Sequence, residues 1–192
     1  MKKIILIGGG GHCKACIDVI ETTGLYRIAG IIDTKDKIGE EVLGYPIIGC
    51  DDDIPKLSKT FNYFFITLGQ IGAPKIRRQL FEKLKNLNLN LPVIISPHAY
   101  ISKHAVINEG SIIMHHACVN ASASIGKNCI INTKALIEHD AIINNHTHIS
   151  TGAVINGGVI VGENCFVGSG AVTKQMVRIK RNQFIKAQTI VS

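Results

Sequence analysis

The sequence has no tryptophan and few other aromatic residues, with four tyrosines and six phenylalanines among 192 residues. A large aromatic core is therefore excluded, and the abundant isoleucine and glycine indicate thin strands and many turns. No apolar run approaches the ~20 residues that a transmembrane helix requires. The apolar start, KKIILIGGGG, is too short for a signal peptide. We therefore expect a cytoplasmic protein without membrane contact.

Acidic residues are also scarce, because 14 Asp and Glu stand against 21 Lys and Arg and leave a net charge of +7. This excess favours anionic partners such as nucleotides, coenzyme A and acidic sugars. No basic run is interleaved with aromatic residues, so we expect no nucleic acid partner. The densest basic stretch, 174–186, is read equally well as a solvated face or as a binding patch.

Disulfides are not expected in the cytoplasm, so the six cysteines need another role. Cys13 and Cys16 form a CxxC motif, which is typical of a redox or metal pair. No second CxxC motif follows, and the same spacing suits the first turn of a helix. Packing is therefore the favoured interpretation for this pair, with redox or metal chemistry as the alternative.

Residues 1–95 alternate between strand and helix patterns, which predicts a Rossmann-like domain with a small parallel sheet. The predicted strands are 2–8, 26–33, 62–69 and 91–96, and the predicted helices are 13–23 and 73–87, with a helix start at 51–53. Gly24 is the expected end of the first helix. In the second, Ile76, Leu80, Leu84 and Leu87 form an apolar stripe. The segment between 33 and 51 reads as a polar connection.

The second half, residues 96–192, follows a period of six. Residues 101–172 divide into twelve consecutive hexapeptides, each beginning with Ile or Val and each with Ala, Ser, Cys, Thr or Val at position five. A period of six excludes an α-helix and differs from the period of two of an ordinary strand. We interpret each hexapeptide as one side of a triangular prism, with the large residue inside and the small one where the chain turns.

Three such sides make an 18-residue coil, and coils stack at about 4.8 Å, the spacing of parallel strands. Residues 101–190 then form five coils, of which the last begins one side with Thr173, has Gln183 at one fifth position and resembles a polar cap. Cys129 and Cys165 occupy position five and are expected to be small core residues. The outward positions three and four include several histidines and asparagines, which we expect to face solvent.

Several segments together carry a resemblance to a known family. These are ILIGGGGHCKACIDVI, Asp33 after the second strand, FFITLGQIGAPKIRRQL, SPHAYIS and INTKALIEHDAIINNHTHISTGAVINGGVIVGENCFVGSGA. They resemble the sugar O/N-acetyltransferases among the left-handed β-helix acyltransferases. That group includes sialic-acid O-acetyltransferases and N-acetyltransferases of nucleotide-linked 4-amino sugars. The resemblance implies an α/β domain followed by a left-handed parallel β-helix, acetyl-CoA as cosubstrate and a homotrimer.

The resemblance also implies site residues. His139 aligns with the catalytic base and Asp140 with its acidic partner. Acetyl-CoA contacts are implied for His148, Gly157 and Ser169. Substrate contacts are implied for Gly8, Gly9, Gly10, Gly11, His12, Asp33, Gly69 and Asn132. Backbone N–H groups at a helix start suit phosphate, but Cys13 replaces the third glycine of a dinucleotide motif, so NAD is disfavoured.

The stretch ALIEHDAIINNHTHIS poses the central question, because His139 lies between two acids among isoleucines. A zinc site is disfavoured, since His139 and His148 start on different prism faces, and we expect no metal. A solvent-facing polar residue is the plainest alternative. A neutral imidazole, however, suits deprotonation of an acceptor that attacks a thioester. Asp140 can reach the ring only if the chain turns there, and Glu138 is the reserve candidate.

We therefore expect an acetyl-CoA-dependent acetyltransferase that N-acetylates a nucleotide-linked 4-amino sugar by direct transfer. The alternatives are O-acetylation of sialic acid or a sialic-like acid, and a non-catalytic trimeric binding scaffold. Cysteine nucleophilic catalysis is disfavoured, because no cysteine neighbours the His139 segment. A Gly157-Gly158 pair permits close approach of a thioester, and a backbone N–H there can support an oxyanion.

Overall fold

The structure is a computed structural model that describes residues 1–71 and 74–192. The chain forms two compact units, which we describe separately. The N-terminal unit comprises Met1–Gly69 and Ile76–Pro92, and the β-helix unit comprises Gln70–Lys75 and Val93–Ser192. The chain enters the second unit at Val93, whereas the boundary predicted from the sequence lies two residues later, after residue 95. The short segment Gln70–Lys75 groups with the β-helix although it lies inside the first half of the sequence.

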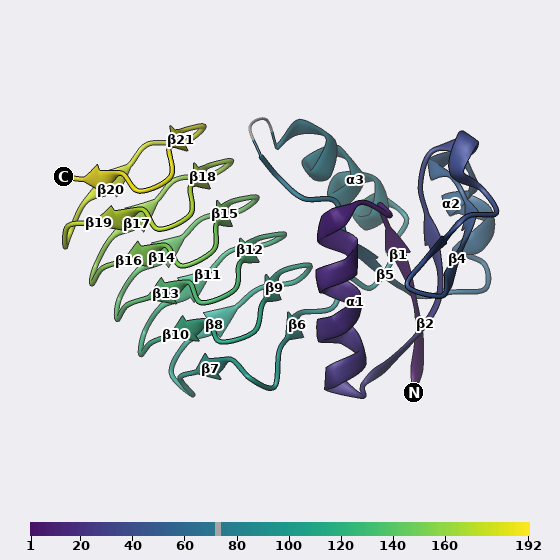
Figure 1. The fold of residues 1–192 in the computed structure, drawn as a ribbon, viewed down its shortest axis with the longest axis horizontal. Coiled ribbons are helices and arrows are strands. Elements are labelled where there is room, and N and C mark those ends of the chain that lie inside the picture. Colours follow the sequence, from purple (N-terminus) through teal and green to yellow (C-terminus); the bar gives the residue numbers. More distant parts are fainter. Residues whose placement is uncertain (72–73) are drawn as a thin grey trace. The chain divides into compact units, whose positions relative to one another are not determined.

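The N-terminal unit is built on a sheet with strand order β3-β4-β2-β1-β5 (Figure 1). Strands β1 (Lys2–Ile7), β2 (Tyr26–Ile32), β4 (Tyr45–Gly49) and β5 (Tyr63–Ile66) run parallel, and β3 (Glu41–Val42) pairs antiparallel to β4. The helices are α1 (Gly11–Thr23), α2 (Ile54–Leu57) and α3 (Lys75–Asn86), with short 3-10 turns at Lys35–Lys37 and Asp51–Asp53.

The sequence misses β3 and β4. Their segment contains Gly44, Pro46 and Gly49, and such residues are typical of turns. Pairing with β2 nevertheless makes it a strand, because Ile47 is buried opposite Ile31. The predicted connection between 33 and 51 therefore contains an additional parallel strand of the sheet.

The two longer helices match the predicted elements, with one correction. Gly24 ends α1 in the left-handed conformation, at φ 63°. Ala73, the first residue of the predicted second helix, lies outside the described residues. In α3, Leu80 and Leu84 are buried as expected, but Ile76 and Leu87 are exposed. The true buried face includes Arg77, whose guanidinium donates to the carbonyl oxygens of Ile66 and Leu68 at 2.8 Å each.

Both cysteines of the CxxC motif are buried free thiols on α1. Burial raises the pKa of the Cys16 thiol far above its usual range. Because redox and metal chemistry require the thiolate, this environment disfavours both. The pair packs in the core, as the helix interpretation predicted.

The β-helix unit stacks two-residue strands in three parallel sheets (Figure 1). Neighbours in each sheet lie 18 residues apart, as in Ile137 opposite Ile155. The strands are β6 (Ile94–Ile95), β7 (Tyr100–Ile101), β8 (Val106–Ile107), β9 (Ile112–Ile113), β10 (Cys118–Val119), β11 (Ser124–Ile125), β12 (Ile130–Ile131), β13 (Leu136–Ile137), β14 (Ile142–Ile143), β15 (His148–Ile149), β16 (Val154–Ile155), β17 (Ile160–Val161), β18 (Phe166–Val167), β19 (Val172–Thr173), β20 (Arg178–Ile179), β21 (Phe184–Ile185) and β22 (Ile190–Val191).

One strand prediction is wrong. Residues 91–96 do not add a fourth strand to the Rossmann-like sheet. Ile94 and Ile95 instead pair with Ile112 and Ile113 as the first strand of the β-helix. The 18-residue spacing explains the difference, because residue 94 is already in phase with the repeat. The predicted repeat therefore begins one strand too late.

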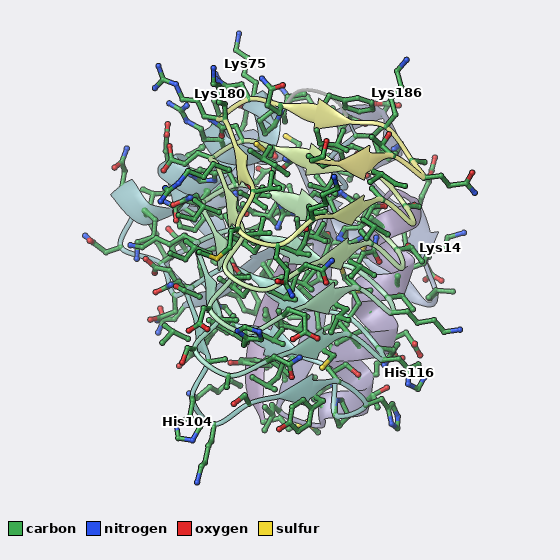
Figure 2. All side chains as sticks on the ribbon, turned by 90° about the vertical axis from the view of Figure 1, so that its left-hand side faces the viewer. Lys14, Lys75, His104, His116, Lys180 and Lys186 are labelled. Atoms are coloured by element: carbon green, nitrogen blue, oxygen red, sulfur yellow. The ribbon has the colours of Figure 1, made fainter. Side chains whose placement is uncertain are left out.

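The prism core has the predicted composition. Position-one residues such as Ile137 and Ile155 are buried, and so are the position-five residues Cys129 and Cys165. Position four adopts the left-handed conformation in coil after coil, which produces the turn between sides. Figure 2 shows His104 and His116, two position-four residues, pointing outward. Asn128 is an exception to the expected exposure, because its side chain is buried and bonded to the His146 ring at 3.0 Å.

The stacking continues to the last residues, since β20, β21 and β22 extend all three sheets. Only Gln183 departs from the small fifth residue in this last coil, and the left-handed turns persist at Met176, Asn182 and Gln188. Figure 2 shows Lys180 and Lys186 of this end projecting into solvent. Within the described part of the chain, no helix is long and apolar enough to cross a membrane.

Candidate active site

His139 and Asp140 form a hydrogen-bonded pair at the turn that follows β13. The Nδ1 atom of His139 lies 2.8 Å from Oδ2 of Asp140. A carboxylate only accepts, so Nδ1 carries the proton and Nε2 is left with a free lone pair. Asp140 occupies position four, with φ at 59°. That left-handed turn brings the two adjacent side chains together, which an extended strand would prevent.

Glu138, the reserve candidate for the base, supports the turn. Its Oε2 atom accepts from the backbone N–H of His139 at 3.2 Å and from the side-chain amide of Asn120 at 3.0 Å. Asn120 lies on the neighbouring coil, 18 residues earlier in the chain. The carboxylate is therefore held by two donors and anchors the segment on which His139 stands.

The pair is exposed, with 60% of the His139 side chain and 64% of the Asp140 side chain accessible. The hydrogen bond to Asp140 raises the pKa of the His139 imidazole above its usual range, and the nearby negative charge of Glu138 adds to this shift. A carboxylate partner thus makes the ring a stronger base and stabilises its cationic form. Both properties suit a group that takes up a proton during a reaction.

Gly157 lies against the reactive edge of the His139 ring. A Cβ atom built on Gly157 would stand 2.8 Å from both Cε1 and Nε2 of His139. The next residue, Gly158, donates its N–H to the carbonyl oxygen of His139 at 3.0 Å and adopts φ 66°. A side chain at Gly158 would collide with the Met176 sulfur. Gly157 therefore keeps open the space in front of the base, and Gly158 leaves room for the Met176 side chain.

A cavity of about 420 Å³ opens at this point of the β-helix unit. It is lined by His139, Asp140, Ile142, Gly157, Gly158, Ile160, Gln175, Met176 and Arg178. The cavity thus contains the predicted base, its carboxylate and one predicted acetyl-CoA contact. The sequence pattern did not predict three of these lining residues, Gln175, Met176 and Arg178. They lie two 18-residue coils after His139, in a stretch whose only recognisable feature is its basic charge.

His148 and Asn132 lie together elsewhere on the same unit. The Asn132 side-chain amide stands 3.2 Å from Nε2 of His148. The other ring nitrogen, Nδ1, lies 2.7 Å from the carbonyl oxygen of Gln70. His148 is only 5% exposed and packs edge-on against Phe166. The third predicted acetyl-CoA contact, Ser169, is exposed and shares a hydrogen bond of 2.9 Å with the Ser150 hydroxyl.

The Gly-rich loop of the N-terminal unit closes on Asp33. The Gly9 N–H donates to Oδ2 of Asp33 and the Thr34 N–H to Oδ1, both at 2.7 Å. Burial alone would raise the pKa of Asp33, but the Thr34 and Gly9 bonds and the Lys37 ammonium together hold it below its usual range. Asp33 is therefore a largely buried carboxylate that binds the loop itself.

The remaining loop residues differ in their surroundings. Gly8 adopts φ 102° and packs against Leu68, whereas Gly10 and Gly11 have open space where a side chain would be. Those two glycines begin α1 and expose its N-terminus, where an anion is favoured. A Cβ atom on Gly69 would touch Cβ of His12 at 3.4 Å, so these two predicted substrate contacts also adjoin.

A second cavity, of about 400 Å³, lies at the carboxyl ends of the parallel strands in this unit. It is lined by Ile7, Gly8, Ile32, Asp33, Thr34, Lys35, Cys50, Asp51, Asp52, Leu68, Ile76 and Leu80. Open parallel sheets bind ligands at this end. The exposed Ile76, which the sequence assigned to the core, is explained by its place in this wall.

No cluster of three or more potential metal ligands occurs among residues 1–71 and 74–192. His139 follows strand β13 and His148 lies in strand β15, and these two strands belong to different sheets of the prism, as expected. The structure thus groups the predicted residues, except Ser169, into three sets. These are His139, Asp140 and Gly157; His148 and Asn132; and the Gly-rich loop with Asp33, His12 and Gly69.

Comparison with known proteins gives a consistent result. The family described as the PglD N-terminal domain matches residues 3–84. The UDP-N-acetylbacillosamine N-acetyltransferase of Bacillus subtilis (strain 168) is 35% identical over 114 residues, which cover 59% of this chain and 52% of that protein. An uncharacterized protein of Acanthamoeba polyphaga mimivirus is 36% identical over 109 residues, but only 20% of its length is covered. The matches thus span about half of the first curated relative and a fifth of the second.

Solved structures match over the whole chain. Perosamine N-acetyltransferase from Caulobacter crescentus, solved as a mutant in complex with CoA and GDP-perosamine, is 31% identical with a TM-score of 0.92, and the match covers 100% of this chain and 89% of that one. The acetyltransferase domain of PglB from Neisseria gonorrhoeae FA1090 is 30% identical with a TM-score of 0.90, over 100% and 92% of the two chains. The same domain has been solved with acetyl coenzyme A. The predicted fold class, an α/β domain followed by a left-handed parallel β-helix, is confirmed.

Proposed function

The chain belongs to the family of hexapeptide-repeat sugar acetyltransferases whose β-helix follows a PglD N-terminal domain, and on that premise we propose that it transfers the acetyl group of acetyl-CoA to the amine of a nucleotide-linked amino sugar. The observation that carries the proposal is the His139–Asp140 pair, which presents a free imidazole nitrogen beside Gly157 in an open cavity. Three related structures contain CoA with GDP-perosamine, an amino-sugar nucleotide.

The reaction needs a proton acceptor at the moment of attack. The sugar amine attacks the thioester carbonyl, and Nε2 of His139 takes the proton that the nitrogen loses. Asp140 accepts from Nδ1 and stabilises the resulting imidazolium. The carbon–sulfur bond then breaks, and the CoA sulfur leaves with that proton, which returns His139 to its neutral form. The oxyanion is stabilised by the N–H of Gly157, since the Gly158 N–H already donates to His139.

The two cavities divide the substrates between them in this proposal. The N-terminal unit binds the nucleotide, with its phosphates at Gly10 and Gly11, where backbone N–H groups begin α1. His12, Asp33 and Gly69 surround the same loop. The β-helix unit binds acetyl-CoA along its coils, with the thioester at Gly157 and the rest of the molecule toward Ser169. No step requires a metal ion or an acyl-enzyme.

A homotrimer completes the proposal. Outward positions on two faces of the prism carry exposed apolar side chains along the stack, namely Tyr100, Val172 and Ile190 on one face and, with Ser124 between them, Val106 and Ile142 on the next. Exposed apolar rows of this kind favour association. We propose that neighbouring copies cover them and border the His139 cavity, of which Ile142 is part. Sedimentation equilibrium should give three times 20.8 kDa, and a monomer at assay concentration would contradict this.

The test is a thiol-release assay with acetyl-CoA and a panel of acceptors. The panel contains UDP-, GDP- and dTDP-linked 4-amino sugars, free sialic acid and CMP-linked sialic acid. We expect stoichiometric thiol release and N-acetyl product with at least one amino sugar. Release with the sialic acids alone would replace N-acetylation by O-acetylation. Absence of release with every acceptor would leave a binding scaffold as the correct interpretation.

A further inference from the structure

Three acidic side chains near the cavity of the N-terminal unit already have partners in the protein. Both carboxylate oxygens of Asp33 accept backbone N–H groups at 2.7 Å. The Asp52 carboxylate pairs with the Lys35 ammonium at 3.0 Å. The Asp53 carboxylate accepts from the backbone N–H of Cys50 at 2.9 Å. These three carboxylates therefore stabilise the ends of β2 and β4 and their turns.

A fourth acidic residue, Asp51, also lines this cavity, and its carboxylate has no such partner. Among residues 1–71 and 74–192, no hydrogen bond or ion pair joins that carboxylate to another group. The backbone of Asp51 is nevertheless held in place, because its carbonyl oxygen accepts from Nζ of Lys83, on α3, at 2.6 Å. Burial raises the pKa of the Asp51 carboxyl above its ordinary range. A ligand that donates hydrogen bonds to this carboxylate therefore replaces hydration that it has lost.

The strand order places Asp51 where a nucleotide presents its base. The proposed phosphate site lies after β1, and the sheet continues from β1 through β2 to β4, after which Asp51 follows. In dinucleotide folds the phosphates lie at the end of the first strand and the ribose at the end of the second. A nucleotide laid in this direction brings its base to the end of β4. The cavity of about 400 Å³ has apolar walls that suit the flat faces of a base, formed by Ile7, Ile32, Leu68, Ile76 and Leu80.

The chemistry of a carboxylate distinguishes between the bases. A carboxylate offers two acceptor oxygens and no donor, so it binds best to two adjacent N–H groups. Guanine has such a pair on one edge, N1–H and the 2-amino group. Uracil and thymine have a single N3–H between two carbonyl oxygens, which would repel the second carboxylate oxygen. In adenine and cytosine, the amino group lies beside a ring nitrogen that only accepts.

We propose that Asp51 binds the N1–H and 2-amino groups of guanine and thereby selects a GDP-linked amino sugar as the acceptor. The inference rests on the proposed function, which assigns the nucleotide to this cavity, and it specifies which nucleotide binds. Asp51 is in this role a specificity-determining residue of the N-terminal unit. The chemistry at His139 is the same for every base.

The first test measures binding of nucleoside diphosphates by titration calorimetry and needs no acetyl transfer. GDP should bind about 10- to 100-fold more tightly than UDP, and about tenfold more tightly than IDP, whose base lacks the 2-amino group. 2′-Deoxy-GDP should bind like GDP. Equal affinities for GDP and UDP would overturn the proposal. So would a loss with 2′-deoxy-GDP and none with IDP, because Asp51 would then bind the ribose.

The second test changes the specificity. Asp51→Asn keeps the size of the side chain and replaces one acceptor oxygen by a donor, which matches the N1–H and the 2-carbonyl of xanthine. The variant should bind GDP about 10- to 100-fold more weakly than the wild type and XDP about tenfold more tightly than GDP. Glu41→Gln is the matched control, because it removes one negative charge from the same unit at an exposed position outside the cavity. The ratio of GDP to UDP affinity should stay unchanged in this control. An unchanged ratio in Asp51→Asn, with an unchanged melting temperature, would overturn the proposal.

The acceptor panel separates this inference from the proposed function. We expect a higher kcat/KM for the GDP-linked amino sugar than for its UDP- and dTDP-linked counterparts. Preference for a UDP- or dTDP-linked sugar would overturn the role of Asp51 and leave the proposed function intact. If no amino sugar is acetylated but GDP binds through Asp51, the proposed function fails and the nucleobase assignment stands.

Discussion

Replacing Gly157 by alanine should displace the catalytic base without disturbing the fold. Gly157 does not adopt the left-handed conformation, so alanine causes no backbone strain at this position. Its Cβ would stand 2.8 Å from Cε1 and Nε2 of His139, whereas ordinary contacts begin at 3.4 Å. The ring must therefore retreat by about 0.6 Å, and the exposed side chain has room to do so. That movement changes the geometry of the 2.8 Å bond between Nδ1 and Asp140.

A misplacement of about 1 Å at a reacting group can cost ~100-fold in rate. For the smaller shift at His139 we expect kcat to fall about 10- to 50-fold, with the melting temperature nearly unchanged. The assay is continuous thiol release from acetyl-CoA with saturating amino sugar. In a His139→Ala background the same substitution should cause no further loss, because the colliding ring is gone. An unchanged kcat in Gly157→Ala, or a further loss in the double variant, would refute the reasoning.

Three other substitutions test separate parts of the account. Asp140→Asn removes the carboxylate that raises the His139 pKa, so the acidic limb of the pH profile of kcat/KM should move to lower pH while the plateau falls. An acidic limb that stays in place would show that Asp140 does not set the pKa of His139. Asp33→Asn should lower the free energy of unfolding by about 1.5–3 kcal/mol at pH 7 in urea titrations. Since the folded-state pKa of Asp33 is lowered, that difference is present above its ordinary pKa and should disappear as the pH falls through the folded value. Ile155→Ala should cost about 2–5 kcal/mol in the same measurement, whereas Leu25→Ala, at an exposed position outside the proposed trimer interface, should change it by no more than about 0.5 kcal/mol.

The β-helix could be predicted from the sequence because every coil repeats the same six-residue pattern of large and small side chains. Ile137 and Ile155 fill the interior and Cys129 fits a crowded corner, so side-chain size alone gives the register. The start was missed because Ile94 also continues a run that reads as an ordinary strand. Strand β4 was missed because turn-forming residues surround it, and pairing with β2 overrides their local preference.

The active site was predictable only in part. His139 stood out because packing explained its neighbours and left it without a role, and the resemblance supplied one. The bond to Asp140 depends on the left-handed turn at position four, a backbone property that the hexapeptide pattern did not reveal. The environment of His148 was beyond prediction, because Gln70 lies 78 residues away in the chain. Contacts of that separation come from tertiary structure and not from local pattern.

The central claim is that His139 is the general base for acetyl transfer to an amino sugar. The most direct measurement compares kcat/KM for the amino-sugar nucleotide between wild type and His139→Ala across the pH range. We expect a loss of about 100-fold or more at neutral pH, and an acidic limb that is present in the wild type and absent in the variant. Equal rates in the two proteins, or an acidic limb that survives in His139→Ala, would contradict the account.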